Sequence, residues 1–435
     1  MDGGSITMTI EHKHTLWNIL DNCRGALPTR HCLDIITTIA TCASLDQEQF
    51  NQVKEMGASA LVPALEDMLK EQKANYPIAF EAAYDLRELP DQKLSNIVYN
   101  LAGLSDLAPL SSALREALID NSGKLGGEFG SSTFMTTLLP ALIGEVKDKT
   151  LLDATCGLAR MTSLINTRSS NFQEHNPDSA SLSLRLLLIE EKKTTISVGN
   201  SLLGLKQSDR LFDLVVMEPP LGLKLDAQTR KEIQKLPYII DEHKAIPTSG
   251  GDALWIQLAL HHLNDFGKAY LVLPQGILFR GGYDGYIREH LLNNELVDKV
   301  IALPSGAVNG TNIEPVLLVL NKAKEKGSPI RFVDLRHMGI QKGKPSKLDN
   351  DDLKFALNLI EGGIEDTQKA RNITIREIRQ TEPDNTGNNL NVSRYVQTQE
   401  EITLPTEQEQ IDLLLKAKQR FDKFQEELLT QLNQQ

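Results

Sequence analysis

The stretch Thr150-Leu-Leu-Asp-Ala-Thr-Cys-Gly-Leu-Ala-Arg160 joins a short apolar strand to a turn that leads into a helix. Asp153 is expected to end the strand, and open α/β sheets bind their ligands at the carboxyl ends of strands. The turn is not a phosphate-binding loop, because it lacks Gly-x-Gly-x-x-Gly and no Gly-Lys-Ser/Thr sequence follows it. Taken alone, it is equally consistent with an ordinary strand-to-helix connection in which Asp153 is a cap.

Short apolar runs of the same kind recur through the middle of the chain and alternate with helical stretches. Continuous apolar strands interleaved with helices are typical of a parallel sheet that is covered on both faces. We therefore predict an α/β fold. The runs lie at 150–153, 211–217, 268–274, 298–304, 315–321 and 330–334.

Three segments differ in texture and predict three domains. Residues 1–118 have apolar positions at helical spacing and form a helical N-terminal domain, which a glycine-rich break separates from an α/β domain at 119–345. Residues 346–435 form a C-terminal extension that ends in an amphipathic helix. Thr406 and Glu409 make a capping-box pattern at the start of this helix, whose apolar stripe either docks on a partner subunit or packs against its own chain.

Composition limits the classes of function. The 435 residues carry 46 basic and 58 acidic side chains, a net charge of −12, which does not suit a lone DNA-binding protein. Any nucleic-acid contact is therefore expected to be local or aided by a partner. We find no export signal, no run near the roughly 18 apolar residues of a membrane span and no metal-binding pattern. Four widely spaced cysteines fit a reducing cytoplasm.

A second acid follows the turn at 150–160 at a sequence spacing that is known from dinucleotide-binding folds. Glu174 comes 21 residues after Asp153, close to the roughly 20-residue offset at which dinucleotide-binding folds place an acid on ribose hydroxyls. A nucleoside that lacks phosphates and carries its own cationic groups would need acids here rather than a phosphate cradle. S-adenosylmethionine is such a ligand. The alternative is a surface acid in a polar loop at 169–176.

The third feature is Asp213-Leu-Val-Val-Met-Glu-Pro-Pro-Leu-Gly222, a buried strand that runs into two prolines. Two prolines restrict the local backbone and remove two N–H donors, so carbonyl oxygens remain free to accept hydrogen bonds. A rigid set of acceptors is what an exocyclic amine needs. The alternative is a stiff loop without any chemistry.

Five segments in this order resemble the adenine-N6 DNA methyltransferases, specifically the modification subunit of type I restriction systems. They are Gly127-Glu-Phe129, Asp153-Ala-Thr-Cys-Gly157, Phe172-Gln-Glu174, Gly199-Asn-Ser-Leu202 and Glu218-Pro-Pro-Leu-Gly222. Further segments extend the resemblance along nearly the whole chain, at 16–20, 273–282, 300–304, 310–313 and 391–395.

The resemblance implies a Rossmann-like methyltransferase domain that uses S-adenosyl-L-methionine. It implies that Glu174 holds the ribose hydroxyls and that Asn200 lies near the cofactor adenine. A loop over the methionine end and the turn after the first strand would complete the pocket. These cofactor-binding residues are Gly127, Glu128 and Phe129 in the loop and Asp153, Thr155 and Gly157 in the turn.

The resemblance also implies the catalytic residues and the partners. The Glu218 side chain and the Pro219 carbonyl would accept hydrogen bonds from the N6 amine of adenine, with Pro220 stiffening the segment and Leu221 in the place of an aromatic residue that stacks on the flipped base. The partners would be DNA, a DNA-specificity subunit and, as a further candidate, a restriction subunit in a hetero-oligomer, with no membrane.

The site departs from the family pattern at several positions. Glu218 replaces an Asn or Asp, Leu221 replaces an aromatic residue, Ala154 and Ala159 replace Pro and Gly, and Gly130-Ser-Ser132 replaces an aromatic-Thr-Pro sequence. Three functions therefore stay open: adenine methylation, a catalytically silent DNA-binding or assembly subunit, and methylation of another amine or amide such as a protein glutamine.

Overall fold

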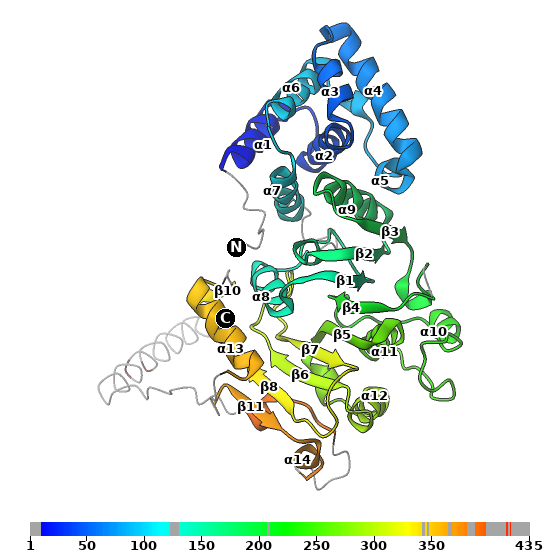
Figure 1. Cartoon of the computed structure of the whole chain (residues 1–435), viewed down its shortest axis with the longest axis vertical. Coiled ribbons are helices and arrows are strands. Elements are labelled where there is room, and N and C mark those ends of the chain that lie inside the picture. Colours follow the sequence, from blue (N-terminus) through cyan, green and yellow to red (C-terminus); the bar gives the residue numbers. More distant parts are fainter. Residues whose placement is uncertain are drawn as a thin grey trace, which may run out of the picture. The chain divides into compact units, whose positions relative to one another are not determined.

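A sheet of nine strands, counted over the described residues, runs through the fold (Figure 1). The structure is a computed structural model that describes residues 10–121, 130–206, 209–341, 344–345, 348–363, 368–380, 388–396, 415 and 418. The strands are β1 (Val146–Asp153), β2 (Thr167–Glu174), β3 (Thr194–Val198), β4 (Phe212–Met217), β5 (Leu263–Pro274), β6 (Val297–Ala302), β7 (Pro315–Asn321), β8 (Ile330–Asp334) and β11 (Ala370–Ile373). Their order is β11-β8-β6-β7-β5-β4-β1-β2-β3, and β9 (Ile340–Gln341) pairs separately with β10 (Lys344–Pro345).

The sheet is mixed, which corrects the expectation of a parallel sheet. β7 runs antiparallel to both of its neighbours, β5 and β6, and β11 runs antiparallel to β8. No helix interrupts the segment 303–314 between β6 and β7, so the chain turns back beside β6 instead of crossing over the sheet. β7 is buried on both faces, and its continuous apolar run therefore looks the same in either direction.

All six apolar runs are strands, as predicted, whereas three strands of the nine-stranded sheet were not predicted. β2 and β3 are rich in Ser, Thr and other polar residues, and both contain partly exposed residues. β3 is the edge of the sheet. β2 also overturns the alternative of a polar loop at 169–176, since Glu174 ends this strand. The third, β11, is a short strand at the opposite edge.

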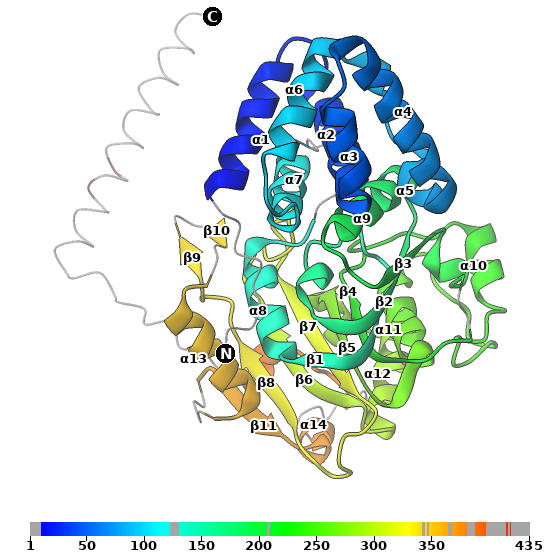
Figure 2. The same cartoon turned by 45° about the horizontal axis from the view of Figure 1, so that its top comes forward.

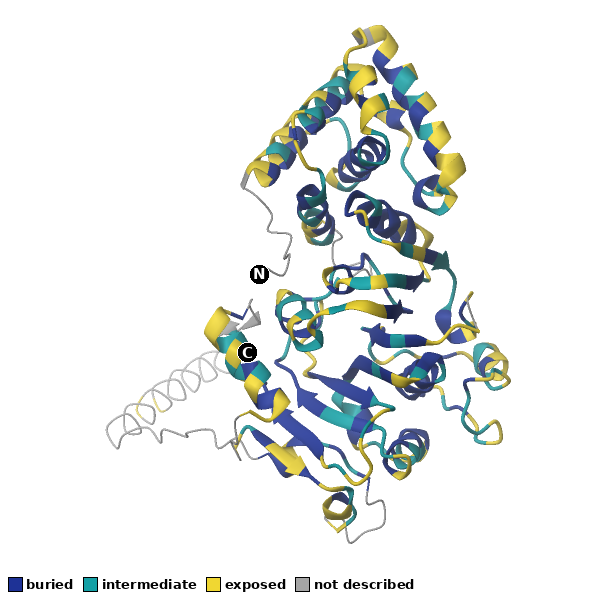
Figure 3. Cartoon of the chain, viewed as in Figure 1, coloured by how far each residue is buried: buried dark blue, intermediate teal, exposed yellow. Residues whose placement is uncertain are grey.

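Helices cover both faces of the sheet, as expected for this fold class (Figure 2). Neighbouring residues on a strand point to opposite faces, so Leu151 and Leu152 belong to different cores. Leu151 shares its core with α8 (Thr133–Ile143), α9 (Pro177–Ile189) and α13 (Asn350–Glu361). Leu152 shares the other core with α10 (Ala227–Ile233), α11 (Gly251–His262), α12 (Gly282–Asn293), α14 (Ile375–Gln380) and α15 (Val392–Tyr395). Figure 3 shows the strands between them as mostly buried.

The predicted helical region at the N-terminus is confirmed. It consists of α1 (Ile10–Cys23), α2 (Thr29–Leu45), α3 (Gln47–Lys54), α4 (Ala58–Asn75), α5 (Pro77–Glu81), α6 (Asp91–Ala102) and α7 (Ala108–Asp120). Helix α3 has a side-chain cap at its start, because the Asp46 carboxylate accepts from the Gln49 N–H at 2.8 Å. Helices α2, α5 and α7 pack against α9, so these helices continue the core of the first face.

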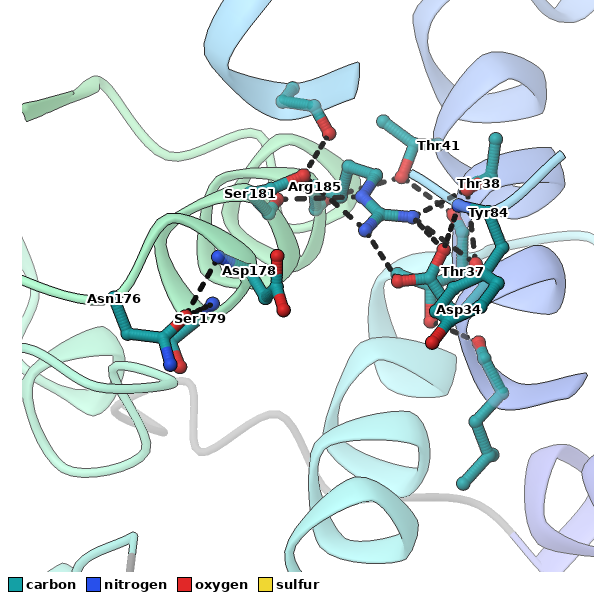
Figure 4. A network of polar contacts seen from close by, with 12 residues as sticks. Asp34, Thr37, Thr38, Thr41, Tyr84, Asn176, Asp178, Ser179, Ser181 and Arg185 are labelled. Carbon is teal, nitrogen blue, oxygen red and sulfur yellow. Dashed lines mark hydrogen bonds and ion pairs between the residues drawn. The ribbon is translucent and has the colours of Figure 1, made fainter. Parts of the chain in front are cut away.

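A buried ion pair joins α2 to α9 (Figure 4). The Arg185 guanidinium donates from Nη1 and Nη2 to the two carboxylate oxygens of Asp34, at 2.9 and 2.8 Å, and also to the hydroxyl of Thr38. The Tyr84 N–H donates to the same carboxylate at 3.1 Å. Arg185 is fully buried, and these bonds supply the partners that a buried charge requires.

The predicted C-terminal helix after Thr406 lies outside the described residues, apart from the helical and exposed positions Leu415 and Lys418. Across the described ranges, no helix combines the length and the apolar character that crossing a bilayer would demand.

Candidate functional site

A cavity of about 650 Å³ opens where the strand order of the sheet reverses. The chain moves outwards from β1 through β2 to β3 and then returns to β4, on the other side of β1. Such a switch point is where open α/β sheets bind their ligands, beside the carboxyl ends of the strands. The cavity is lined by residues that end or follow four strands: Ala154, Thr155, Gly157 and Leu158 after β1, Glu174 and His175 at β2, Asn200 and Ser201 after β3, and Glu218 to Leu221 after β4.

Glu174 ties the ends of β1 and β2 together. Its Oε2 accepts from the Gly157 N–H at 2.9 Å, and its Oε1 accepts from the Asn176 N–H at 2.9 Å. A carboxylate has about four acceptor positions, so it can accept further bonds from a ligand in the cavity. The structure thus brings Glu174 and Gly157 together at the cavity wall.

Asp153 lies beneath the turn and is not among the residues that line the cavity. Its Oδ1 accepts from the Thr155 N–H at 3.0 Å, and its Oδ2 accepts from the Thr162 hydroxyl at 3.0 Å. Burial raises the pKa of Asp153 to about 7; the hydrogen bonds oppose this rise, and the nearby charge of Glu174 adds to it. Asp153 therefore shapes the turn from below, while Thr155 and Gly157 form its surface.

The turn after β1 keeps a backbone that favours glycine at two positions. Gly157 and Ala159 both have a φ of 51°. An L side chain in this left-handed region crowds its own backbone, so Ala159 is strained at the position where the family usually has Gly. The departure at Ala159 therefore places a side chain on a backbone conformation that favours glycine.

Asn200 lines the cavity close to the end of β3. Its Oδ1 accepts from the Leu202 N–H at 3.0 Å and caps the short 3-10 turn Ser201–Leu203 (η3). The side-chain oxygen keeps one further acceptor position, and the amide nitrogen of Asn200 can donate.

Glu218 follows β4 and presents an unusual carboxyl group. Although part of the residue is exposed, both carboxylate oxygens are shielded from solvent and have no hydrogen-bond partner among the described residues. Burial raises the pKa of Glu218 to about 7. The nearby Ser131 side chain lowers this pKa, Asp153 raises it and Arg160 lowers it. No described group meets full hydrogen-bond geometry at either carboxylate oxygen.

The double proline and Leu221 line the cavity beside Glu218. Pro219 is buried and Pro220 is exposed, so the segment leaves the sheet at this point. Leu221 is half-buried and packs against the core of the first face. The four residues predicted as catalytic therefore share one wall of the cavity.

The segment before α8 is described from Gly130 onwards. Gly127, Glu128 and Phe129 lie outside the described residues, so their predicted place over the cofactor remains a prediction. Gly130 lines the cavity, and the Ser132 hydroxyl caps α8 by accepting from the Met135 N–H at 3.2 Å.

The far wall of the cavity was not assigned a role from the sequence. It includes Trp255 on α11 and the residues Val308 to Thr311 and Ile313 between β6 and β7. Asn309 joins this loop to the opposite side, since its Nδ2 donates to the Gly130 carbonyl at 2.6 Å. The resemblance of segment 310–313 to the family was the one sequence signal for this wall. No sequence signal marked Trp255, because it looks like any apolar residue of a buried helix.

Comparisons with known proteins find similarity over most of the chain. The family model described as N-6 DNA Methylase matches residues 114–403. The methylase subunit of the type I restriction enzyme MpnII from Mycoplasma pneumoniae is 26% identical over 311 residues, covering 65% of this chain and 55% of that protein. The chain spans about half the length of the curated relatives it matches.

Two solved structures share the fold. The methyltransferase subunit of a type I restriction-modification system from Streptococcus thermophilus superposes with a TM-score of 0.67 and 20% identity, covering 89% of this chain and 99% of that chain. A chain from a structure on complex assembly and conformational transition of the type I system has a TM-score of 0.64 and 17% identity, covering 99% of both chains. The family model confirms the resemblance, and the two structures confirm the Rossmann-like fold that the motifs predict.

Proposed function

Since this chain belongs to the N-6 DNA methylase family, we propose that it is the modification subunit of a type I restriction system and transfers a methyl group from S-adenosylmethionine to adenine N6 in DNA. One observation carries the proposal: a single cavity at the switch point has Glu174 on one wall and Glu218 to Leu221 on another. The first wall suits a nucleoside cofactor, and the second suits an exocyclic amine.

The residues around Glu174 fit S-adenosylmethionine. The volume of about 650 Å³ lies within the range of roughly 300–1,000 Å³ that is usual for small-molecule sites. None of the described residues that line the cavity is Lys or Arg, which disfavours a phosphate-bearing ligand and suits a cationic one. Glu174 would accept from the ribose hydroxyls, Asn200 would donate to the adenine, and the Gly157 turn would let the ligand lie close to the backbone.

The residues around Glu218 fit the amine. When bound, S-adenosylmethionine supplies an activated methyl group on its sulfonium. The lone pair of adenine N6 is delocalised into the ring, so acceptors that hold the amine hydrogens favour the charge that develops on nitrogen. Glu218 and the carbonyl of Pro219 would provide these acceptors from a rigid segment.

The target base must leave the duplex to reach this wall, at a cost of a few kcal/mol. Leu221 offers an apolar contact where the family has a ring, and the buried Trp255 contributes an aromatic side chain to the same cavity. The base would therefore meet apolar surface even without the usual aromatic platform.

DNA recognition is assigned to a specificity subunit, with a restriction subunit as a further partner in the hetero-oligomer. The net charge of −12 supports this division, because an acidic chain gains little from DNA phosphates on its own. The alternative of a catalytically silent subunit is not favoured, since the cavity stays open despite Glu218 and Leu221.

The test is methyl transfer by the chain in complex with its specificity subunit. We expect labelled methyl groups from S-adenosylmethionine to enter unmethylated duplex DNA and to be recovered as N6-methyladenine. The variant Glu174→Ala should raise the KM for the cofactor, whereas Pro219→Ala should lower kcat. Cofactor binding without any transfer would contradict the proposal and would support the silent subunit.

A further inference from the structure

The carboxyl group of Glu218 differs from the other acids at the strand ends. Glu174 and Asp153 both accept hydrogen bonds from backbone N–H groups. Both oxygens of Glu218 are buried at the cavity wall and have no partner among the described residues. A buried polar group without a partner costs free energy, so this carboxyl group is set up to pair with something that enters the cavity.

The charged groups around Glu218 determine whether its carboxyl group is neutral or ionised when it pairs with a ligand in the cavity. The charged groups near it are Asp153 at the end of β1 and Arg160 in the following turn. Arg160 is engaged elsewhere, because its Nη1 donates to the Ser131 carbonyl at 2.5 Å and its Nη2 lies 3.8 Å from a carboxylate oxygen of Glu116. The described lining residues from α11 and from the loop between β6 and β7 carry no charge.

These surroundings favour the neutral acid. Burial and the negative charge of Asp153 raise the pKa of Glu218 to about 7, while Ser131 and Arg160 lower it only in part. The neutral form is therefore well populated below pH 7. A neutral carboxyl group offers one O–H donor and one carbonyl acceptor, whereas an ionised one offers acceptors only.

We propose that Glu218 binds the target adenine as a neutral carboxylic acid, accepting from the N6 amine through its carbonyl oxygen and donating its O–H to ring nitrogen N1. This inference rests on the proposed function, because it takes adenine as the methyl acceptor. It concerns recognition of the base and adds no step to the methyl transfer.

The pairing explains why a glutamate can occupy this position. An amide side chain presents one acceptor and one donor, and the neutral acid presents the same pair. An ionised Glu218 would instead place a negative oxygen against the lone pair of N1. Glu218 therefore matches the adenine edge that carries N6 and N1 only when its carboxyl group is neutral.

The pH dependence of methylation tests the inference. The full chain with its specificity subunit is supplied with S-adenosylmethionine and unmethylated duplex DNA, and N6-methyladenine is measured as a function of pH. For the natural chain we expect the rate to fall about tenfold or more between pH 6 and pH 8.5, because the neutral acid is lost. Glu218→Gln, whose amide keeps the donor and acceptor, should lose this dependence.

A matched control is Glu314→Gln. Glu314 is an exposed acid next to the cavity loop and is not among the lining residues, so this variant should keep the pH profile of the natural chain. Identical profiles for the natural chain and Glu218→Gln would overturn the inference while leaving the proposed function intact.

Infrared difference spectra between the natural chain and Glu218→Gln give a readout that does not need activity. We expect the carbonyl stretch of a protonated carboxyl group at pH 6 and its loss at pH 8.5. Absence of this band at pH 6 would overturn the inference even if methylation proceeds. If the band is present but no base is methylated at any pH, the proposed function fails, and the pairing with adenine fails with it.

Discussion

Arg115 in α7 donates a hydrogen bond from Nε to the carbonyl oxygen of Leu158 at 2.8 Å. Leu158 lines the cavity, so a helix from the N-terminal part of the chain holds the turn that follows β1. The same guanidinium donates from Nη1 to Oε1 of Glu190, at the end of α9, at 2.6 Å. Both side chains are 3% exposed. One buried cation therefore links α7, α9 and the cavity wall.

Removing this cation should cost much of the stability. Arg115→Met leaves the Glu190 carboxylate buried without its cationic partner, and we expect the free energy of unfolding to fall by about 3–5 kcal/mol. The double variant Arg115→Met/Glu190→Gln removes the charge as well and should recover part of the loss. Urea unfolding measures both. Equal losses in the single and double variants would contradict the role of the ion pair.

The contact between Asp34 and Arg185 predicts a similar loss at the interface of α2 and α9 (Figure 4). Asp34→Asn leaves the fully buried Arg185 charge uncompensated, so the free energy of unfolding should fall by about 3–5 kcal/mol. Asp21→Asn is the control, because Asp21 pairs with Arg24 on the exposed surface. That variant should change the stability by about 1 kcal/mol or less. Equal effects of the two variants would show that burial does not decide the outcome.

The backbone conformation of Ala159 leads us to expect that replacing this residue with glycine stabilises the protein. Its φ of 51° suits glycine, so Ala159→Gly should raise the free energy of unfolding by about 0.5–1 kcal/mol, after the extra chain entropy of glycine is counted. Ala154 is the matched control in the same turn, since it is buried and is not among the residues with positive φ. Ala154→Gly should lower the stability by about 1 kcal/mol. Thermal or urea unfolding that moves both variants in one direction would refute the strain at Ala159.

The raised pKa of Asp153 should make the difference in unfolding free energy between the natural chain and Asp153→Asn depend on pH. Burial raises its pKa to about 7 in the folded chain, so between about pH 4 and pH 7 the folded state binds more protons than the unfolded state. The stability that this group contributes is therefore present at low pH and is lost as the pH rises to 7. Asp153→Asn does not titrate. Its free energy of unfolding, relative to the natural chain, should rise between about pH 5 and pH 8.5. A difference that stays constant over this range would show that Asp153 is not perturbed.

The sequence predicted most of the sheet but not its direction or its polar edge. Each of β4 to β8 contains a buried apolar run, which reveals a strand but hides the reversal at β7. β2 and β3 were not predicted, because they lie near an edge of the sheet and carry polar residues. Strand direction depends on pairing partners that are distant in the chain.

The sequence predicted the residues on two walls of the cavity. It did not predict which side chains are buried beneath the cavity surface or which residues form the far wall. The spacing of Glu174 and the double proline after Glu218 pointed to residues that do meet at one cavity. Nothing in the spacing showed that Asp153 turns inwards to Thr162, or that Trp255 completes the far wall. Those facts follow from packing between elements that are far apart in the sequence.

Calorimetric titration of the chain with S-adenosylmethionine tests the central claim most directly, because every catalytic proposal depends on cofactor binding in this cavity. We expect saturable binding at one site per chain. Glu174→Ala should weaken it about tenfold or more, since hydrogen bonds to a charged group contribute roughly 1.5–3 kcal/mol. The control Glu242→Ala changes an exposed acid that is not among the lining residues and should bind like the natural chain. No heat of binding, or equal affinity for the natural chain and Glu174→Ala, would contradict the account.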